Sequence, residues 1–355
     1  MKKYKVLDLF CGCGGISEGF RLAGCEIVMG IDINQSAIDT YNKNFGEGKG
    51  VCCNLLDYNE NEIVKSKVLN EGIDIIIGGP PCQGFSSANR WSDTSNDVRN
   101  QLFFEYVKFV DLLKPKAILI ENVAQIITKN NGIVKDTIYE IFESRGYKVN
   151  HSVLKAEEYG VPQKRRRNFF VILRNDVFDF SLVKKSSLVT VKEAISDLYN
   201  FNQNDDGIYL GKKPFNEYLK YVRNSKYIHN HYISYPTLAT QLKMNYVPQG
   251  GNWRNIPEHM FKTVRSNRHS SAYRRLNENE PSVTIDTGNA HSNYYHPLYN
   301  RIPTVREAAR LQSFSDSFIF MGSKSEQYVQ VGNAVPPLLA KAIATTIIEV
   351  LNNEE

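Results

Sequence analysis

The sequence lacks the marks of several classes of protein. No apolar run approaches the ~20 residues that cross a membrane, and the amino-terminal MKKYKVLDLF has no apolar core or cleavage site of a signal peptide. Internal repeats and low-complexity tracts are also missing. The remaining composition is that of a globular protein, 42% hydrophobic and 23% charged over 355 residues. This length predicts about two domains.

Cysteine is scarce and unpaired in the sequence. The six cysteines fall in the first quarter of the chain and none belongs to a C-x-x-C pair, whereas the seven histidines begin at His151. This spacing disfavours both a disulfide framework and a zinc site. We therefore expect reduced thiols, a cytoplasmic protein and no bound metal.

Positive charge is concentrated in one stretch. The net charge is +5, yet Arg223–Arg275 alone holds nine Lys and Arg residues against one acidic residue, Glu258. A basic block of this kind predicts contact with a polyanion such as nucleic acid. A solvated charged face is the alternative for any single residue in it.

Strand and helix patterns alternate through the first half of the chain. This alternation predicts an α/β fold of βαβ units with a mostly parallel sheet, in which an antiparallel edge pair is plausible for the last strands. The expected strands are Lys5–Phe10, Glu26–Asp32, Val51–Leu55, Asp74–Gly78, Ala117–Glu121, Lys148–Leu154 and Phe169–Leu173. The expected helices are Ile16–Ala23, a helix capped by Asn34 and running to Phe45, Leu102–Leu113 and Gly132–Arg145.

The composition and periodicity of the sequence change after Leu173. Residues 175–303 are rich in Asn, Ser, Tyr and His and have weak periodicity, which predicts a second, irregular domain of loops and short strands. Helical patterns return at Val305–Phe314 and Pro337–Leu351. The last of these is amphipathic, so we expect it to pack back on the sheet.

A glycine-rich turn follows the first expected strand. Gly12, Gly14 and Gly15 open a helix there, and glycine lets the backbone approach a ligand closely. The third glycine of G-x-G-x-x-G is replaced by Ser17, which weakens a dinucleotide reading. Asp32 ends the second strand twenty residues after Gly12 and could bind both hydroxyls of a ribose. Together, the glycine-rich turn and Asp32 favour a nucleoside cofactor over a tight turn that binds no ligand.

The run IIIGGPPCQGFS at residues 75–86 is the most informative in the chain. An apolar strand ends in two glycines, two prolines and Cys82, and each proline stiffens the turn. A thiol held on a stiff turn at the carboxyl end of a strand has the position that a nucleophile needs. A buried structural cysteine is the ordinary alternative, but the polar loop that follows, Gln83–Arg99, disfavours it.

Two further motifs carry charge at the ends of strands. Glu121 follows the strand Ala117–Ile120, where a carboxyl beside Cys82 could act as a general acid. Gln163, Arg165 and Arg167 have period-two spacing and share one face if the next strand begins early. A capping carboxylate and a solvated edge-strand charge run are the respective alternatives.

Six motifs, taken in order, resemble the cytosine-5 DNA methyltransferases. They are DLFCGCGG (8–15), GGPPCQGFS (78–86), ENV (121–123), QKRRR (163–167), REAARLQSF (306–314) and QVGNAVPPLLA (330–340). The resemblance implies a Rossmann-like S-adenosylmethionine-dependent methyltransferase domain, residues 1-174 plus 325-355, with a smaller irregular target-recognition domain, residues 175-324. It implies methyl transfer from S-adenosylmethionine to C5 of a cytosine flipped out of duplex DNA.

The resemblance also assigns roles to residues. Cys82 would add to C6 of the base as a thiolate, Glu121 would hold and protonate N3, and one of Arg165 and Arg167 would contact O2. The implied cofactor-binding residues are Phe10, Gly12, Gly14, Asp32, Ile33, Asn54, Pro81, Leu102 and Asn333, with Asp57 as the alternative to Asn54. The expected DNA contacts are Ser86, Arg99 and Gln163, and the basic stretch adds Trp253, Arg254, Arg274 and Arg275.

The implied partner is double-stranded DNA, and the cofactor product is S-adenosylhomocysteine. We expect a monomer in the bacterial cytoplasm, associated with the nucleoid through DNA and independent of membranes. A cognate restriction endonuclease encoded nearby would not contact it. The alternatives are a DNA-binding regulator without chemistry, a related enzyme acting on transfer RNA, and a nicotinamide-dependent oxidoreductase. The intact Cys82 counts against a regulator without chemistry. The long variable stretch counts against an enzyme acting on transfer RNA, and the missing third glycine counts against an oxidoreductase.

Overall fold

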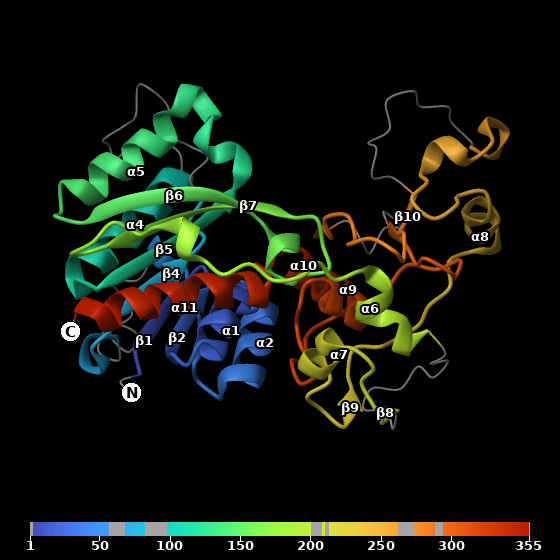
Figure 1. The fold of residues 1–355 in the computed structure, drawn as a ribbon, viewed down its shortest axis with the longest axis horizontal. Coiled ribbons are helices and arrows are strands. Elements are labelled where there is room, and N and C mark those ends of the chain that lie inside the picture. Colours follow the sequence, from blue (N-terminus) through green and yellow to red (C-terminus); the bar gives the residue numbers. More distant parts are fainter. Residues whose placement is uncertain are drawn as a thin grey trace. The chain divides into compact units, whose positions relative to one another are not determined.

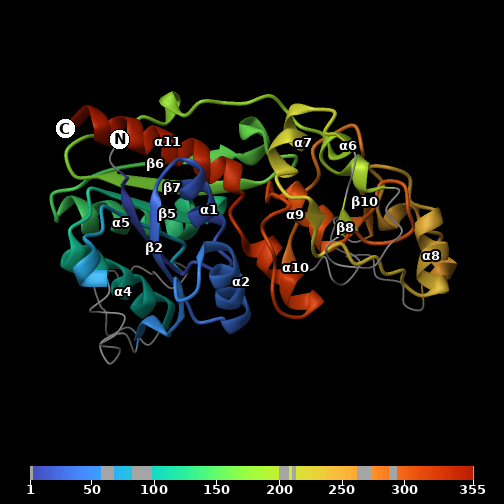
Figure 2. The same cartoon turned by 90° about the horizontal axis from the view of Figure 1, so that it is seen from below.

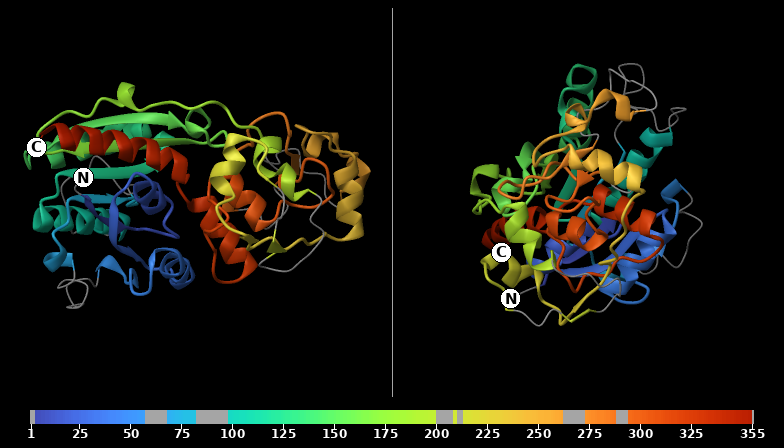
Figure 3. Two further views of the ribbon diagram at one scale, coloured as in Figure 1. Left: turned by 60° about the horizontal axis from the view of Figure 1, so that its bottom comes forward. Right: turned by 90° about the vertical axis from the view of Figure 1, so that its right-hand side faces the viewer.

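The structure, a computed structural model, describes residues 3–56, 68–81, 98–199, 208–209, 213–261, 273–287 and 294–354, with the backbone alone at 98–100, 130, 131, 208 and 209. The chain packs as two compact units. The first consists of Met1–Tyr159, Arg166–Lys185 and Val335–Glu355, and the second of Gly160–Arg165 and Ser186–Ala334. The amino- and carboxyl-terminal segments both belong to the first unit (Figure 3).

The first unit is built on a seven-stranded sheet of order β3-β2-β1-β4-β5-β7-β6. Neighbouring strands are parallel except around β7, which runs antiparallel to both β5 and β6. The strands are β1 (Lys5–Leu9), β2 (Glu26–Asp32), β3 (Gly50–Cys52), β4 (Ile75–Gly78), β5 (Ala117–Val123), β6 (Lys148–Lys155) and β7 (Arg166–Leu173). The carboxyl ends of β1, β2, β4 and β5 therefore meet at one edge of the sheet, where open α/β proteins bind ligands.

Helices cover both faces of this sheet (Figures 1 and 2). Buried side chains of α4 and α5 pack with those of the strands in one large apolar core, while α1 packs against α11. The helices and 3₁₀ turns of the first unit are α1 (Gly15–Leu22), α2 (Gln35–Phe45), α4 (Val98–Leu113), η2 (Ala124–Ile127), η3 (Lys129–Gly132), α5 (Ile133–Glu143), η4 (Ala156–Tyr159), η5 (Phe180–Leu182) and α11 (Pro337–Glu354).

Glycine is required where backbones approach closely in this unit. A Cβ on Gly78 would lie 2.1 Å from the carbonyl oxygen of Leu9, so a side chain would push β4 away from β1. A Cβ on Gly19 would lie 2.4 Å from the Cβ of Ala340, which is why α1 and α11 can pack so tightly. Close packing of this kind tolerates little added volume.

The expected strands and the helix cap are confirmed. Asn34 caps α2 through its side-chain oxygen, which accepts a hydrogen bond from the amide of Ala37 at 3.0 Å. The antiparallel pairing of the last two strands is also confirmed. Strand β7 begins three residues before the expected Phe169, but not early enough to meet the condition for a shared face of Gln163, Arg165 and Arg167. The strand begins at Arg166, so Gln163 and Arg165 precede it and share no strand face with Arg167.

The second unit has short helices and strands of two residues. Its elements are α6 (Val191–Ile195), η6 (Ser196–Leu198), β8 (Ile208–Tyr209), α7 (Glu217–Val222), β9 (Tyr227–Ile228), α8 (Leu238–Asn245), η7 (Trp253–Asn255), η8 (Glu258–Met260), β10 (Arg274–Arg275), β11 (Tyr294–Tyr295), α9 (Val305–Leu311) and α10 (Lys324–Asn333). One of its apolar clusters is formed by Met244, Val247, Ile256 and Tyr295.

Buried ion pairs also hold the second unit together. The guanidinium of Arg301 donates to both carboxylate oxygens of Glu307, at 2.6 and 2.8 Å, and Arg310 does the same to Asp316, at 2.9 and 2.8 Å. Burial alone would raise the pKa of Glu307, but the charge and hydrogen bonds of Arg301 hold that pKa well below its usual range. Helix α9 is thus anchored by paired charges.

One segment differs from the expectation about membrane-length apolar runs. Lys324–Glu354 is long and apolar enough to cross a membrane by length and composition, but 61% of its most apolar window is buried inside the protein. It consists of two helices, α10 and α11, with Pro336 between them. Burial to this extent is typical of a core helix, so the length and apolar composition of this segment are only weak evidence for a membrane span.

Candidate active site

The turn after β1 is fastened to the end of β2. The amide of Gly12, whose φ is 52°, donates to Oδ2 of Asp32 at 2.9 Å, and the amide of Asn34 donates to Oδ1 of the same carboxylate at 2.9 Å. The Asp32 carboxylate therefore holds together the turns that follow β1 and β2, where the sequence predicts a nucleoside site. Each carboxylate oxygen retains further acceptor capacity.

Gly12 and Gly14 serve this turn in different ways. A Cβ on Gly14, at φ 94°, would lie 2.5 Å from the ring of Phe45, so packing requires glycine there. A Cβ on Gly12 would meet nothing within 4 Å, so it would project into open space beside the turn. Ile33, which follows Asp32, is 69% exposed and offers apolar surface at the same edge. Open space, a carboxylate and an apolar side chain fit a nucleoside ligand.

A buried acid lies in the strand that leads to the turn. Asp8 is 1% exposed; Oδ2 accepts a hydrogen bond from the hydroxyl of Ser17 at 2.6 Å, and that hydroxyl also lies 2.8 Å from the hydroxyl of Tyr41. Burial, and secondarily the charge of Asp32, raise the pKa of Asp8 to about 7 despite the Ser17 bond. Asp8 therefore links β1 to α1 and α2 as a largely protonated acid below that pH.

The second part of the site forms where β4 and β5 end side by side. The two strands are parallel, with Gly78 opposite Ile120. A Cβ on Gly79 would lie 3.3 Å from Oε2 of Glu121, so this turn lies against the Glu121 carboxylate. The turn continues through Pro80 and Pro81 into Cys82, which lies outside the described residues. The expected adjacency of these strands is confirmed.

Glu121 has a guanidinium partner on the neighbouring strand. Nε of Arg167 lies 2.8 Å from Oε1 of Glu121, and both side chains are mostly buried, with 19% and 16% exposed. In the antiparallel pairing of β5 with β7, Val123 lies opposite Arg167. Glu121 is two residues before Val123, so its side chain and that of Arg167 lie on the same face of the sheet. A carboxylate and a guanidinium thus lie together, partly open to solvent, beside the Gly79 turn.

Asn122 belongs to the ENV motif, and the structure shows what its side chain does there. Its side-chain amide donates to the carbonyl of Pro80 at 3.2 Å and so holds the turn before Cys82. Its position directly after Glu121, at the end of an apolar strand, was the only signal in the sequence.

The other predicted cofactor residues of the first unit occupy varied places. Phe10 has the left-handed φ of 62° and is half-buried beside the core, as is Leu102. The side-chain oxygen of Asn54 accepts from the amide of Leu56 at 3.2 Å. Pro81 is half-buried. Asp57 and Ser86 lie outside the described residues, and Arg99 is described by its backbone alone.

Three predicted site residues are buried in the second unit with their polar groups engaged. Gln163 is 0% exposed and Arg165 1%, and both bind backbone carbonyls. Arg275 is 6% exposed and donates to five acceptors, the carbonyls of Met244, Val247, His296 and Tyr299 and the side chain of Asn300. All three hold backbone in place. The DNA contacts of Gln163 and Arg275 and the base contact of Arg165 stay predictions.

The remaining predicted contacts of the second unit are accessible. Arg254 is exposed and stacks over the ring of Trp253, with its guanidinium carbon 5.3 Å from the ring centroid. Arg274 is half-buried in β10, next to Arg275. Asn333 ends α10 and is exposed.

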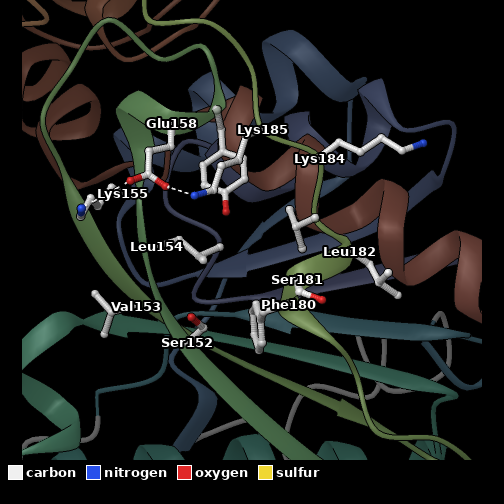
Figure 4. Close-up of a pocket in the computed structure, with 12 residues that line it drawn as sticks. Ser152, Val153, Leu154, Lys155, Glu158, Phe180, Ser181, Leu182, Lys184 and Lys185 are labelled. Atoms are coloured by element: carbon white, nitrogen blue, oxygen red, sulfur yellow. Dashed lines mark ion pairs between the residues drawn. The ribbon is translucent and has the colours of Figure 1, made fainter.

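Metal ligands do not gather in the described part of the chain, where no group of three or more His, Cys, Asp or Glu residues could hold an ion. The five described cysteines, Cys11, Cys13, Cys25, Cys52 and Cys53, are free thiols. A cavity of about 640 Å³ lies between β6, η4 and η5 (Figure 4). Its lysines Lys155 and Lys185 are paired with Glu158, and it contains none of the predicted site residues.

The sheet order, the glycine turn with Asp32 and the polar groups at the ends of β4 and β5 define a Rossmann-like methyltransferase. The sequence pattern of C-5 cytosine-specific DNA methylases matches residues 4–349, and the chain belongs to that family. It is a DNA cytosine-5 methyltransferase of the type found in restriction-modification systems.

Known proteins resemble the chain over nearly its whole length. Type II methyltransferase M1.HphI of Haemophilus parahaemolyticus is 37% identical, covering 98% of this chain and 87% of the relative. Type II methyltransferase M.DdeI of Desulfomicrobium norvegicum is 35% identical, covering 96% and 88%. A solved E. coli prophage chain described as a DNA modification methyltransferase has 27% identity and a TM-score of 0.78, covering 99% and 100%.

Stability should depend on pH through Asp8. In the native state it keeps its proton to about pH 7, whereas in the unfolded chain it loses it near pH 4. The native state then binds more protons over this interval, so stability falls as pH rises through it. Asp8→Asn should remove this dependence. Between pH 5 and pH 8 the free energy of unfolding, measured by urea denaturation, should fall by about 2–3 kcal/mol more in the wild-type protein than in the variant. Parallel pH profiles would contradict the assignment.

Proposed function

We propose that Cys82, Glu121 and Arg167 carry out the methyl transfer. The observation that carries this proposal is the Glu121–Arg167 pair at 2.8 Å, lying beside the Gly79 turn that runs directly into Cys82. A carboxyl and a guanidinium side by side can bind the N3 and O2 edge of one cytosine. Cys82 is two peptide bonds beyond Pro80, whose carbonyl Asn122 holds.

The reaction follows from these groups. Cys82 would add to C6 as a thiolate, while Glu121 protonates N3 and so draws electrons away from C6. S-Adenosylmethionine supplies the methyl group that C5 then takes up. Removal of the C5 proton and cleavage of the sulfur–C6 bond would return Cys82 to its thiolate. The base must leave the duplex stack for this chemistry, at a cost of a few kcal/mol.

The cofactor would bind at the glycine turn. Asp32 would bind the ribose hydroxyls, Ile33 would pack on the adenine, and the open space at Gly12 would admit the ligand close to the backbone. Phe10, Gly14, Pro81, Leu102 and Asn333 complete the proposed set, with Asn54 or Asp57 at the adenine. The product is S-adenosylhomocysteine, and the proposed chemistry uses no metal.

Two functional domains are part of the proposal. Residues 1-174 plus 325-355 would carry catalysis and cofactor, and 175-324 would recognise the DNA target. The compact units divide the chain slightly differently, grouping Gly160–Arg165 and the residues up to Ala334 with the second unit. The basic stretch and the exposed Arg254 support a role of the second unit in DNA contact.

We place the protein in the bacterial cytoplasm, bound to the nucleoid through DNA, and expect it to act as a monomer. A cognate endonuclease encoded nearby would share its target sequence without contacting it. The names of the bacterial Type II relatives support this context.

Covalent trapping tests the nucleophile. Duplex DNA with 5-fluorocytosine in the target should form a stable complex with the wild-type protein and S-adenosylmethionine, since fluorine cannot leave C5 as a proton does. Cys82→Ser should abolish the complex on denaturing gels and leave DNA binding largely intact. Trapping that survives this substitution would remove Cys82 from the mechanism.

The two predicted arginines should behave differently. Arg167→Ala should lower the single-turnover methylation rate about 100-fold, because it removes the partner of Glu121, and change the melting temperature little. Arg165→Ala should lower the melting temperature clearly, because it leaves buried carbonyls unpaired. A stable Arg165→Ala protein with the larger loss of rate would reverse the assignment.

Arg254 and Arg275 offer a matched pair for DNA binding. Arg254→Ala should weaken binding to any duplex and reduce the slope of log K against log salt by about 1, as expected for a lost phosphate contact. Arg275→Ala should instead destabilise the protein by about 3 kcal/mol or more through its orphaned acceptors. Salt titration of binding and thermal unfolding of both variants measure the difference, and interchanged phenotypes would refute it.

A further inference from the structure

The short segment Gly160–Arg165 has an unusual place in the chain. It packs with the second unit, yet both its ends continue directly into the first, at Tyr159 of η4 and Arg166 of β7. We call it the strap. The strap is joined by one peptide bond to Arg166, the first residue of the strand that carries Arg167.

Gln163 fixes the centre of the strap. Its side-chain oxygen accepts from the amide of Ile285 at 2.9 Å, and its nitrogen donates to the carbonyl of Leu311 at 3.2 Å and to Oε1 of Gln312 at 2.9 Å. Backbone bonds to Ser282 hold the residues on either side. With its side chain 0% exposed, Gln163 has no water to replace these partners.

The network continues from the strap to the end of α10. Gln312 is also 0% exposed, and its nitrogen donates to the carbonyls of Val331 at 2.7 Å and Ala334 at 3.2 Å. Arg165 donates from its two terminal nitrogens to the carbonyls of Ile285 and Gly332, each at 3.0 Å. Helices α9 and α10 lie side by side here (Figure 1).

These contacts bracket one residue. The carbonyls of Val331, Gly332 and Ala334 flank Asn333, and the last carbonyls of a helix have no partners within it. Gly332 itself can bear no side chain, because a Cβ would lie 2.5 Å from the carbonyl carbon of Asp286. The carboxyl end of α10 is thus fixed both by hydrogen bonds and by close packing.

We propose that Gln163, Arg165 and Gln312 form a polar lock that positions Asn333 for the cofactor and fixes its relation to the strap leading to Arg167. They are positioning residues, since none of them needs to touch a ligand. The inference rests on the proposed function, which places Asn333 in the cofactor site. It makes the two glutamines and Arg165 determinants of cofactor affinity rather than of DNA contact.

A double-mutant cycle on cofactor-product binding tests the lock. Gln312→Met should weaken binding of S-adenosylhomocysteine to the full chain about tenfold, since it frees the end of α10. If Gln312 acts through Asn333, the variant carrying both Gln312→Met and Asn333→Ala should bind no more weakly than Asn333→Ala alone. Isothermal titration calorimetry measures all four affinities.

Gln330→Met is the matched control. Gln330 is buried in α10, and its side-chain nitrogen donates to the carbonyl of Met321, which precedes that helix. Its substitution should change affinity less than twofold and add to the effect of Asn333→Ala. If Gln312→Met does not fold, Arg165→Lys, which keeps the charge and loses the two-pronged grip, takes its place in the same cycle.

The outcomes separate the lock from the proposed function. A wild-type protein that does not bind S-adenosylhomocysteine would refute the proposed cofactor site. A wild-type protein that binds, with Gln312→Met unchanged or additive with Asn333→Ala, would refute the lock alone. The lock is supported if Gln312→Met is non-additive with Asn333→Ala while Gln330→Met is additive with it. A general loss of stability would change the affinities in both double-mutant cycles alike.

Discussion

The parallel pairing of β4 with β5 is the constraint on which the catalytic end depends. It places the Gly79 turn against Glu121, and the antiparallel entry of β7 on the far side of β5 brings Arg167 to the same carboxylate. Three chain segments far apart in sequence therefore converge because backbone hydrogen bonds set their register. A slip of one residue in β7 would turn Arg167 to the other face of the sheet.

The sequence carried enough information for this part of the fold. Apolar runs that end in Asp32, Gly78 and Glu121 predict strands whose carboxyl ends share an edge, and that prediction is confirmed. Asn34 is a signal of the same local kind, since a cap depends on its own few neighbours. Local patterns of this type are readable because period and turn chemistry decide them.

The roles of the polar residues were harder to read. Arg165 and Arg167 are two residues apart, yet one lies buried against carbonyls and the other pairs with Glu121. Their spacing suggested a common face, but β7 begins only at Arg166, and contacts from Ile285 and Gly332 decide where Arg165 points. The burial of Arg275 has the same cause, because its five acceptors come from two segments, Met244–Val247 and His296–Asn300, that precede and follow it in the chain. Long-range partners leave no periodic trace in a single sequence.

The two units are stabilised in different ways, and this difference bears on function. The first buries a continuous apolar core beneath a sheet, which suits a site that must hold a turn and a carboxylate rigidly. The second unit buries arginines that bind carboxylates and carbonyls. Such pairs are costly to desolvate and strongly directional, so they define an arrangement more than they add stability. The geometry of the second unit therefore depends on a few guanidinium contacts that fix where its backbone segments lie.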